Sequence, residues 1–387
     1  MPSSSISSSS RATALYTPAT GARIAARARV RRRRGAGALF LRAGLLLSIA
    51  ALPVEFSAWI DPGHLVPIRT QEAAMARVLA SGRNVTDLGN FNDRAIERSL
   101  AALRTKRAEV LTLGSSRMQP MPASAFPGTV FVNGAMQGGL LDDMIAVYGL
   151  YDTDARRPGR VVINVDPWTE SFDGMASWSA LANERTAVMR RAGIPVSPLR
   201  ERTSIAVKAL KQLAAPEYFR LSVFSYRHYG SRGIMWTATD RVQNTEKTKL
   251  PDGTVVWQVV SEDSALARAL RFSRYDIRVD PRFQHLDARA PGRDGALEKF
   301  VRYLRSEGVE VTMLLVPFPT EMYDAFVAMP GYSLRSVETN LRAISARTGA
   351  GVIGGFDPRP LGITSRDFFD EDHLRPDPLA RLVSSRR

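Results

Sequence analysis

The sequence predicts an α/β protein in which a parallel sheet is covered by helices on both faces. Two observations lead to this fold class. Short aliphatic runs such as "VLTL" and "RVVINV" have the length and composition of buried strands. These runs alternate along the chain with helical patterns, and strands that alternate with helices are typical of βαβ units and a parallel sheet.

The predicted elements follow one another in a regular order that is interrupted once. Strands are expected at 109–113, 129–132, 160–165, 310–316 and 351–353, and helices at 70–79, 93–106, 140–151, 295–307 and 334–348. The aromatic and basic segment from about 170 to 291 breaks the rhythm, so we interpret it as a long insertion after the third strand. Within it, "KLPDGTVVW" predicts a hairpin with its turn at Asp252–Gly253.

The N-terminus differs in composition from the rest of the chain. Residues 1–34 are rich in Ser, Ala and Arg and predict a disordered, basic, cytoplasmic tail. Residues 35–60 follow as an apolar segment broken by Arg42 and Glu55, and residues 61–387 form the expected α/β domain. The uncharged stretch Ala43–Val54 has 12 residues, against the roughly 20 that span a bilayer.

We interpret the apolar segment as a signal anchor, because Arg42 and Glu55 can snorkel toward opposite interfaces. The positive-inside rule then keeps the arginine tail in the cytoplasm. This places a single-pass transmembrane helix in the inner membrane and the main domain in the periplasm. The alternatives are a cleaved signal peptide with a secreted product, twin-arginine export from "RRRR", and a cytosolic protein with a basic tail.

Composition excludes several classes of function. The chain has no cysteine, which excludes disulfides, thiol catalysis and cysteine-ligated metal sites. Residues 1–42 hold nine arginines and no acidic residue; removing these nine from the 53 basic residues leaves 44, against 38 acidic residues. A body that is only mildly basic gives no argument for nucleic acid. Neither a metal nor a cofactor is predicted.

Two polar motifs sit at the ends of predicted strands. "GSSR" follows the strand at 109–113, and "DFFDEDHL" follows the strand at 351–353 and contains Asp370 three residues before His373. A carboxylate at this spacing can hold the imidazole Nδ1–H and leave Nε2 to accept a proton. Because the carboxyl ends of parallel strands share one rim, a serine and this pair can meet there. The alternative interpretation is an ordinary turn followed by a surface Asp–His pair.

The motifs together resemble the SGNH (GDSL-like) hydrolase superfamily, in its membrane-anchored branch with "GSSR", whose members act on bacterial cell-surface polymers. The resemblance covers about 109–165 and 295–376 and implies a flavodoxin-like, three-layer parallel sheet. "VLTLGSSR" is similar to the first family block and implies Ser116 as nucleophile. "VFVNGAMQGG" resembles the second and implies an oxyanion hole from the N–H groups of Ser116 and Gly138. "FFDEDHLRP" is similar to the last and implies Asp370 and His373.

The chain departs from this family at the third block, which normally ends in G-x-N-D with an Asn that donates to the oxyanion. Here the strand ends in "VVINVDPW"; Asn164 lies within it, and Asn133 is a candidate substitute donor. Arg117 follows the nucleophile and is interpreted either as a surface salt bridge or as a contact to an anionic or polyhydroxylated substrate. Trp236 and Trp257 of the insertion are either sugar-stacking residues or part of its core.

These observations predict an exported, membrane-tethered serine enzyme that acts on acyl esters. The resemblance implies O-acetyl transfer or ester hydrolysis on a cell-surface polysaccharide, with a membrane-bound acyltransferase as a candidate partner. The chemistry of the acyl-enzyme is the same for both reactions, and only the acceptor differs. The alternative function is a non-catalytic scaffold that binds or assembles polysaccharide on the same fold.

Overall fold

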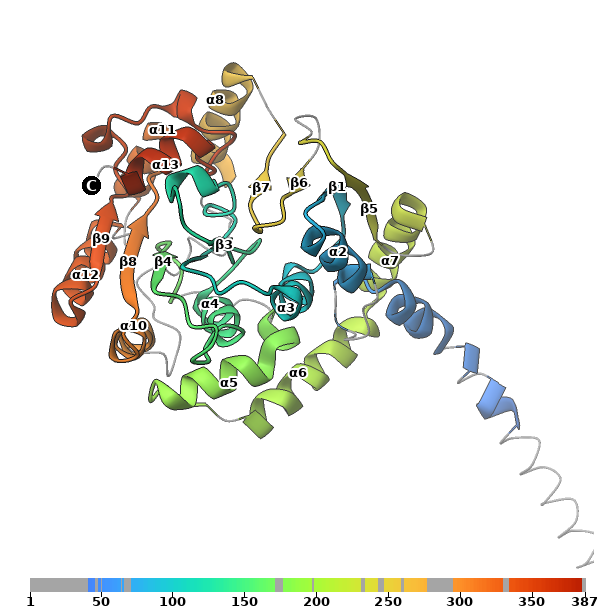
Figure 1. Ribbon diagram of the computed structural model, residues 1–387. Helices are drawn as coiled ribbons and strands as arrows, with labels where there is room; N and C mark the ends of the chain where they lie inside the picture. The colour runs from blue at the N-terminus through green and yellow to red at the C-terminus, as the bar shows by residue number, and fades with distance from the viewer. Residues whose placement is uncertain are drawn as a thin grey trace, which may run out of the picture.

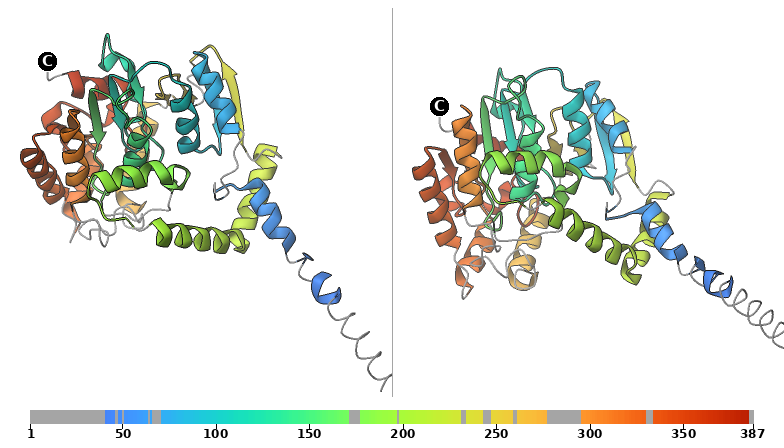
Figure 2. Two further views of the ribbon diagram at one scale, coloured as in Figure 1. Left: turned by 60° about the horizontal axis from the view of Figure 1, so that its bottom comes forward. Right: turned by 90° about the horizontal axis from the view of Figure 1, so that it is seen from below.

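A computed structural model of the chain describes residues 41–45, 48–49, 51–63, 65, 71–170, 177–196, 198–230, 234–242, 247–258, 261–276, 295–329 and 334–384. The predicted tail at 1–34 and the last part of the predicted insertion, 277–291, lie outside these residues. The described part is an α/β fold with two sheets (Figures 1 and 2).

The larger sheet has five strands, all parallel, in the order β3-β2-β4-β8-β9. Its strands are β2 (Val110–Leu113), β3 (Phe131–Asn133), β4 (Arg160–Asn164), β8 (Glu310–Leu315) and β9 (Gly351–Gly354). All five agree with the predicted strands to within two residues. The first of these strands along the chain, β2, lies between the second, β3, and the third, β4. The direction in which strands are added to the sheet therefore reverses between β2 and β4. Open α/β sheets bind ligands at such a reversal.

Helices cover one face of this sheet, and alternate residues along each strand point to them. Leu111, Ile163 and Met313 belong to the cluster packed under the helices, whereas Val110, Val162 and Leu314 face the other side. The helices on the first face are α4 (Leu141–Gly149), α5 (Ala182–Arg191), α10 (Ala296–Ser306), α11 (Thr320–Ala328) and α12 (Leu334–Thr348). The other face is covered by α13 (Pro376–Ser384) and by the loop that follows β2.

A second, smaller sheet lies beside the first and was only partly predicted. Its strands are antiparallel in the order β5-β1-β6-β7, namely β5 (Met235–Thr239), β1 (Asn84–Gly89), β6 (Thr248–Lys249) and β7 (Val255–Val256). Helices α2 (Gln71–Ala80) and α3 (Asp93–Leu103) pack against β1 through a cluster that includes Met75, Ile96 and Val85. Figure 1 shows this group beside the larger sheet. Further described helices are α6 (Pro198–Leu213), α7 (Pro216–Tyr229) and α8 (Glu262–Arg271), and residues 51–60 are helical as well.

The hairpin β6–β7 has its turn where the sequence predicted it, and this turn packs against the larger sheet. Gly253 has φ +97°, and a Cβ there would lie 2.1 Å from the carbonyl oxygen of Asn133, so only glycine fits. The Asn133 N–H donates to the Asp252 carbonyl at 2.7 Å, and the Val255 N–H donates to the Gln119 carbonyl at 2.9 Å. These bonds hold the hairpin beside the loop that follows β2.

The prediction of a transmembrane helix at 35–60 is wrong for the residues that the structure describes. None of the helices among them is both long enough and apolar enough to cross a membrane. The physical reason is already visible in the sequence, because Arg42 and Glu55 leave only the 12 uncharged residues Ala43–Val54 between them.

Candidate active site

The loop that follows β2 presents Ser116 at the carboxyl rim of the larger sheet. Gly114 allows this loop to pass close to β4, because a Cβ at Gly114 would lie 2.7 Å from the Cβ of Asn164 and 3.0 Å from that of Met118. The chain then turns at once, with the Met118 N–H donating to the Ser115 carbonyl at 3.0 Å and the Gln119 N–H donating to the Ser116 carbonyl at 3.2 Å. Ser115 and Arg117 are buried by this turn, and Ser116 is left half-buried between them.

The structure brings Ser116, His373 and Asp370 into one chain of hydrogen bonds. The Ser116 Oγ lies 2.9 Å from His373 Nε2, and His373 Nδ1 lies 2.8 Å from Asp370 Oδ1. The Asp370 carboxylate also accepts the backbone N–H of His373 at 2.9 Å, which folds the Asp370–His373 segment into a tight turn. This is the geometry of a serine nucleophile, a base and a carboxylate that orients the base.

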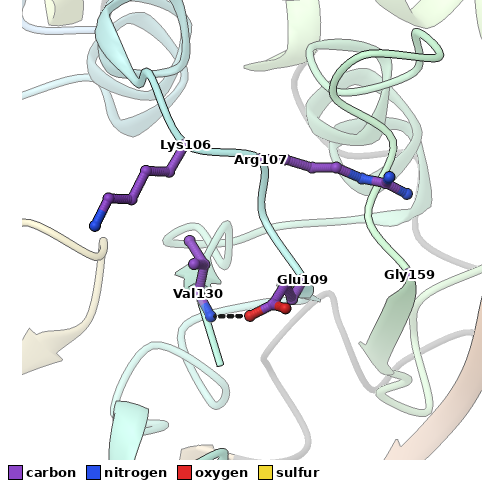
Figure 3. A pocket seen from close by; sticks show the side chains of 5 residues that line it. All are labelled: Lys106, Arg107, Glu109, Val130 and Gly159. Atoms are coloured by element: carbon purple, nitrogen blue, oxygen red, sulfur yellow. Dashed lines mark hydrogen bonds between the residues drawn. The ribbon is translucent and has the colours of Figure 1, made fainter. Parts of the chain in front are cut away.

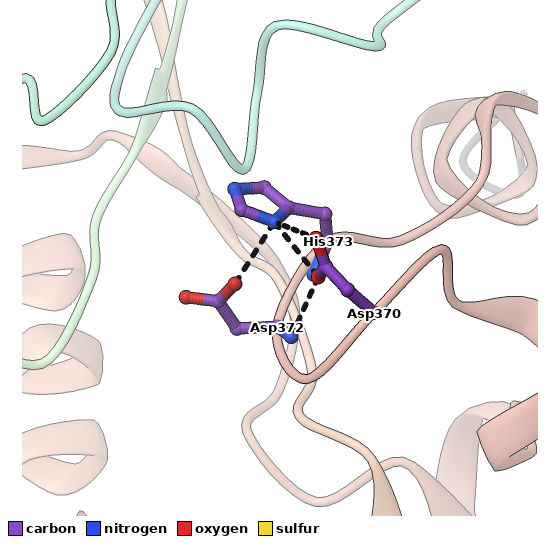
Figure 4. A group of neighbouring side chains, drawn as sticks. All are labelled: Asp370, Asp372 and His373. Atoms are coloured by element: carbon purple, nitrogen blue, oxygen red, sulfur yellow. Dashed lines mark hydrogen bonds and ion pairs between the residues drawn. The ribbon is translucent and has the colours of Figure 1, made fainter. Parts of the chain in front are cut away.

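A second carboxylate, which the sequence interpretation missed, contacts the same imidazole nitrogen. Asp372 Oδ1 lies 2.9 Å from His373 Nδ1, so both carboxylates approach that side of the ring (Figure 4). The "DEDH" motif contains both aspartates, but the three-residue spacing led to Asp370 alone. Asp370 and Asp372 can both reach His373 Nδ1 only for particular backbone angles in this turn, and the sequence does not reveal those angles.

Burial and charge act in opposite directions on His373. Burial alone would lower its pKa, but the charge of Asp372 and the hydrogen bonds from Asp370 and Asp372 outweigh it, and together they raise the pKa of His373 to about 10. The imidazole therefore carries a proton at neutral pH in the resting site. Only the neutral imidazole can accept the Ser116 proton.

Asp370, Asp372 and His373 are also close enough together to be considered as ligands of a metal ion. Their donor atoms lie within 4.8 Å of one another. However, both carboxylates contact the single nitrogen Nδ1 directly, and Nε2 faces Ser116. Hydrogen bonds to an Nδ1–H group account for these contacts without a metal ion.

Arg117 is not at the surface, where the salt-bridge interpretation placed it. Its side chain is fully buried, at 0% exposed, and its guanidinium lies over the ring of Phe318, with the central carbon 4.0 Å from the ring centre. It forms an ion pair with Asp166 at 2.8 Å, and the same group donates to three backbone carbonyls, those of Val316 at 2.8 Å, Pro317 at 2.5 Å and Asp372 at 3.0 Å. Arg117 thus ties together the ends of β4 and β8 and the loop that carries His373, and a contact to substrate is not part of this arrangement.

Asn133, the predicted substitute oxyanion donor, is committed elsewhere. Its side chain is 1% exposed, and its amide N–H groups donate to the backbone carbonyls of the loop after β2, at Met118, Gln119 and Met121. Asn164 is also buried, and its amide donates to Asp166 at 3.3 Å. Asn133 therefore braces the loop after β2 and has no amide N–H left for an oxyanion, whereas Asn164 donates one N–H to Asp166 at the end of β4.

The two predicted backbone donors have no such commitment. Among the hydrogen bonds of the described residues, none is donated by the N–H of Ser116 or of Gly138. The segment that contains Gly138 lies against the end of β2, because the Met136 N–H donates to the Gly114 carbonyl at 3.0 Å. Gly138 itself has φ +60° and is exposed.

The two tryptophans singled out in the sequence have different surroundings. Trp236 lies away from the site, where its indole N–H donates to the Gln71 side chain at 3.1 Å and its ring packs against the cluster under the smaller sheet. Trp257 follows β7 and lies against the imidazole of His373, with the ring centres 4.2 Å apart. Sequence reasoning had no means of separating them, since both lie in the predicted insertion.

A surface hollow at the opposite end of the sheet holds none of these groups (Figure 3). It is lined by Lys106, Arg107, Glu109, Val130 and Gly159, which lie at or just before the amino ends of β2, β3 and β4. Ser116 lies beyond the carboxyl end of β2, so the two places are separated by the length of that strand. Ligands of parallel sheets bind at the carboxyl rim, and the candidate active site is therefore the one around Ser116.

No model of a known protein family matches this chain, and a search of curated proteins finds no match either. The interpretation of the site consequently depends on its own geometry.

Proposed function

We propose that the chain is an exported serine enzyme that cleaves or transfers acyl esters through Ser116, His373 and Asp370. The single observation that carries this proposal is the hydrogen-bonded chain from Ser116 Oγ through the imidazole to Asp370. The strand order β3-β2-β4-β8-β9 also supports an SGNH-type domain, because flavodoxin-like sheets have this order.

The reaction has two half-reactions. Ser116 Oγ attacks the acyl carbonyl while its proton moves to His373 Nε2, and the N–H groups of Ser116 and Gly138 hold the oxyanion. The bond to the alcohol then breaks, and the departing oxygen takes the proton from Nε2. In the second half-reaction, water or a glycan hydroxyl gives its proton to Nε2 and attacks the acyl-enzyme, and Ser116 leaves with that proton.

The acyl group and the acceptor are proposed from the resemblance noted above. Esters on a cell-surface polysaccharide fit an exported enzyme of this kind, with a neighbouring acyltransferase as the source of acyl groups. Whether the second half-reaction uses water or a glycan hydroxyl decides between esterase and transferase, and both use the same three residues.

A second candidate function is a non-catalytic polysaccharide-binding scaffold. It is favoured by one observation: the amide of Asn133, the predicted substitute for the third-block Asn, donates to the loop after β2 and is not available to an oxyanion. Loss of one such donor typically costs about 10² to 10³ in rate, which slows an enzyme without excluding one.

A fluorophosphonate probe distinguishes the two functions. The full chain should be labelled at Ser116, and Ser116→Ala should abolish the labelling, with Ser115→Ala as the matched control that keeps it. The same pair should be compared in hydrolysis of 4-nitrophenyl acetate. If the wild-type chain is neither labelled nor active while circular dichroism shows it folded, the scaffold is the better description.

A further inference from the structure

The hairpin β6–β7 brings a cation and an aromatic ring to the imidazole of the candidate triad. Trp257 follows β7, and its ring centre lies 4.2 Å from that of His373. Lys247 precedes β6, and its Nζ lies 3.8 Å from the centre of the Trp257 ring. The ammonium is thus held in a cation–π contact beside the site.

The Lys247 ammonium lacks the partner that a buried cation ordinarily has. Within the part of the chain that the structure describes, no carboxylate lies within ion-pair distance of Lys247, although its side chain is half-buried. The neighbouring Lys249 provides the contrast, since its buried ammonium pairs with Asp93 at 3.1 Å. Burial lowers the pKa of Lys247, and the more distant charges of Asp93 and Asp370 only partly oppose this effect.

Trp257 has an unused polar group as well. Its indole Nε1 is buried and has no hydrogen-bond acceptor among the described residues. A buried donor without an acceptor is unfavourable, and such groups are often satisfied by a ligand. An unpaired cation and an unpaired donor therefore occur together at one edge of the site.

The position of these groups relative to His373 indicates which part of a substrate they would meet. His373 Nε2 must lie within hydrogen-bond reach of the alcohol oxygen that leaves or attacks, whereas the acyl oxygen faces the N–H groups of Ser116 and Gly138. Trp257 packs on the imidazole, so it lies beside the group that exchanges a proton with this alcohol.

We infer that Lys247 and Trp257 form a subsite for the alcohol part of the substrate and that this alcohol carries an anionic group, a carboxylate or a phosphate. The inference rests on the proposed function and deepens it, because it names the class of alcohol. A uronic acid or a phosphate-substituted sugar has the required chemistry. The Lys247 ammonium binds the anion, and the alcohol ring packs beside the indole.

The test compares acetyl esters that differ in the charge of the alcohol. The full chain is assayed with 4-carboxyphenyl acetate, 4-phosphonooxyphenyl acetate and the neutral 4-(methoxycarbonyl)phenyl acetate, each rate being divided by its hydroxide-catalysed rate. We expect at least one anionic ester to be preferred in kcat/KM by about tenfold, as for one charge-assisted hydrogen bond. The preferred ester distinguishes a carboxylate from a phosphate.

The variants separate recognition from a general effect of charge or structure. Lys247→Met should reduce the preference ratio to about one, Lys247→Arg should retain most of it, and Lys208→Met, at an exposed lysine on α6, should leave the ratio unchanged. If Lys247 merely offset the charge of Asp370, Lys247→Met would change all three esters equally.

The two proposals fail in different ways. If the neutral ester is hydrolysed in a Ser116-dependent manner but the wild-type chain shows no preference for either anionic ester, the subsite is wrong and the proposed function stands. If no ester is hydrolysed and the fluorophosphonate probe does not label Ser116, the proposed function is wrong, and the subsite is wrong with it.

Discussion

The guanidinium of Arg117 donates from Nε to the backbone carbonyl of Asp372 at 3.0 Å. Arg117 directly follows the candidate nucleophile, and Asp372 directly precedes the candidate base. One buried side chain therefore joins two loops whose contacting residues lie 255 positions apart in the sequence. This contact explains why a cation follows the serine in "GSSR", where a surface role was expected.

Replacing Arg117 should lower both stability and turnover. Arg117→Met leaves the buried Asp166 carboxylate without its partner, so we expect the free energy of unfolding to fall by about 3–5 kcal/mol in urea titrations. Arg302→Met, at an exposed arginine paired with Glu298, should cost less than about 1 kcal/mol. Arg117→Lys keeps the charge but cannot reach all four acceptors, so kcat should fall more than KM rises. Equal stability of the two methionine variants would refute the role of Arg117.

The three residues of the triad should behave as one unit. Ser116→Ala and His373→Ala should each reduce kcat on 4-nitrophenyl acetate by about 10⁴-fold or more, and the double variant should be no slower, because either change alone disables the nucleophile. The measurement is a double-mutant cycle in kcat, with circular dichroism as the control for folding. Additive losses would show that the two side chains act separately.

The two carboxylates on His373 Nδ1 should partly replace each other. Asp370→Asn leaves Asp372 as an acceptor for the Nδ1–H, so the correct tautomer is retained and the loss in kcat should be modest, about 10- to 100-fold. Asp370→Asn combined with Asp372→Asn removes both acceptors and should approach the roughly 10⁴-fold loss that follows from the wrong tautomer. A single Asp370→Asn variant as slow as the double variant would contradict a role for Asp372.

The pH dependence of kcat/KM should report the raised pKa of His373. Because the base must be neutral and its pKa is raised to about 10, activity should increase with pH through the neutral range and level off only in alkali. Asp372→Asn removes one cause of the raised pKa, so the acidic limb of the profile should move to lower pH by about one to three units. Glu371→Gln is the matched control, since Glu371 does not contact the imidazole, and it should move the limb far less.

The glycine before the two serines should be intolerant of a side chain. Gly114→Ala places a methyl group 2.7 Å from the Asn164 Cβ, so we expect a loss of about 1–3 kcal/mol in unfolding free energy and a displaced Ser116. Gly159→Ala is the control, because its Cβ would find no heavy atom closer than 3.7 Å. If both variants unfold at the wild-type urea concentration, the loop after β2 is looser than the packing indicates.

The parallel sheet could be predicted because most residues of its strands are buried and apolar. The strand at 84–89 was missed for the opposite reason: "NVTDLG" is largely polar, and only its pairing with β5 and β6 makes it a strand. Single residues whose burial depends on distant partners are equally hard to predict from sequence. Arginine is rarely fully buried unless it is paired, and the acceptors that bury Arg117 lie from 49 to 255 residues away in the chain.

The proximity of Ser116, Asp370 and His373 could be predicted because their motifs follow parallel strands, whose carboxyl ends share one rim of the sheet. The place of Trp257 and Lys247 depends instead on how the β6–β7 hairpin packs against the loop after β2. That packing uses backbone hydrogen bonds and the absence of a side chain at Gly253, neither of which produces a periodic pattern in the sequence.

The pairing of Ser116 with His373 joins residues 257 positions apart. Contacts of this sequence separation form late, because the intervening chain must first be ordered. A polypeptide that emerges from the ribosome therefore carries its nucleophile long before its base, and the triad is completed only when nearly the whole described chain has been synthesised. If the proposed function holds, a product terminated before Asp370 would be inert toward esters, and hydrolytic activity would report that the loop carrying His373 has been synthesised and folded.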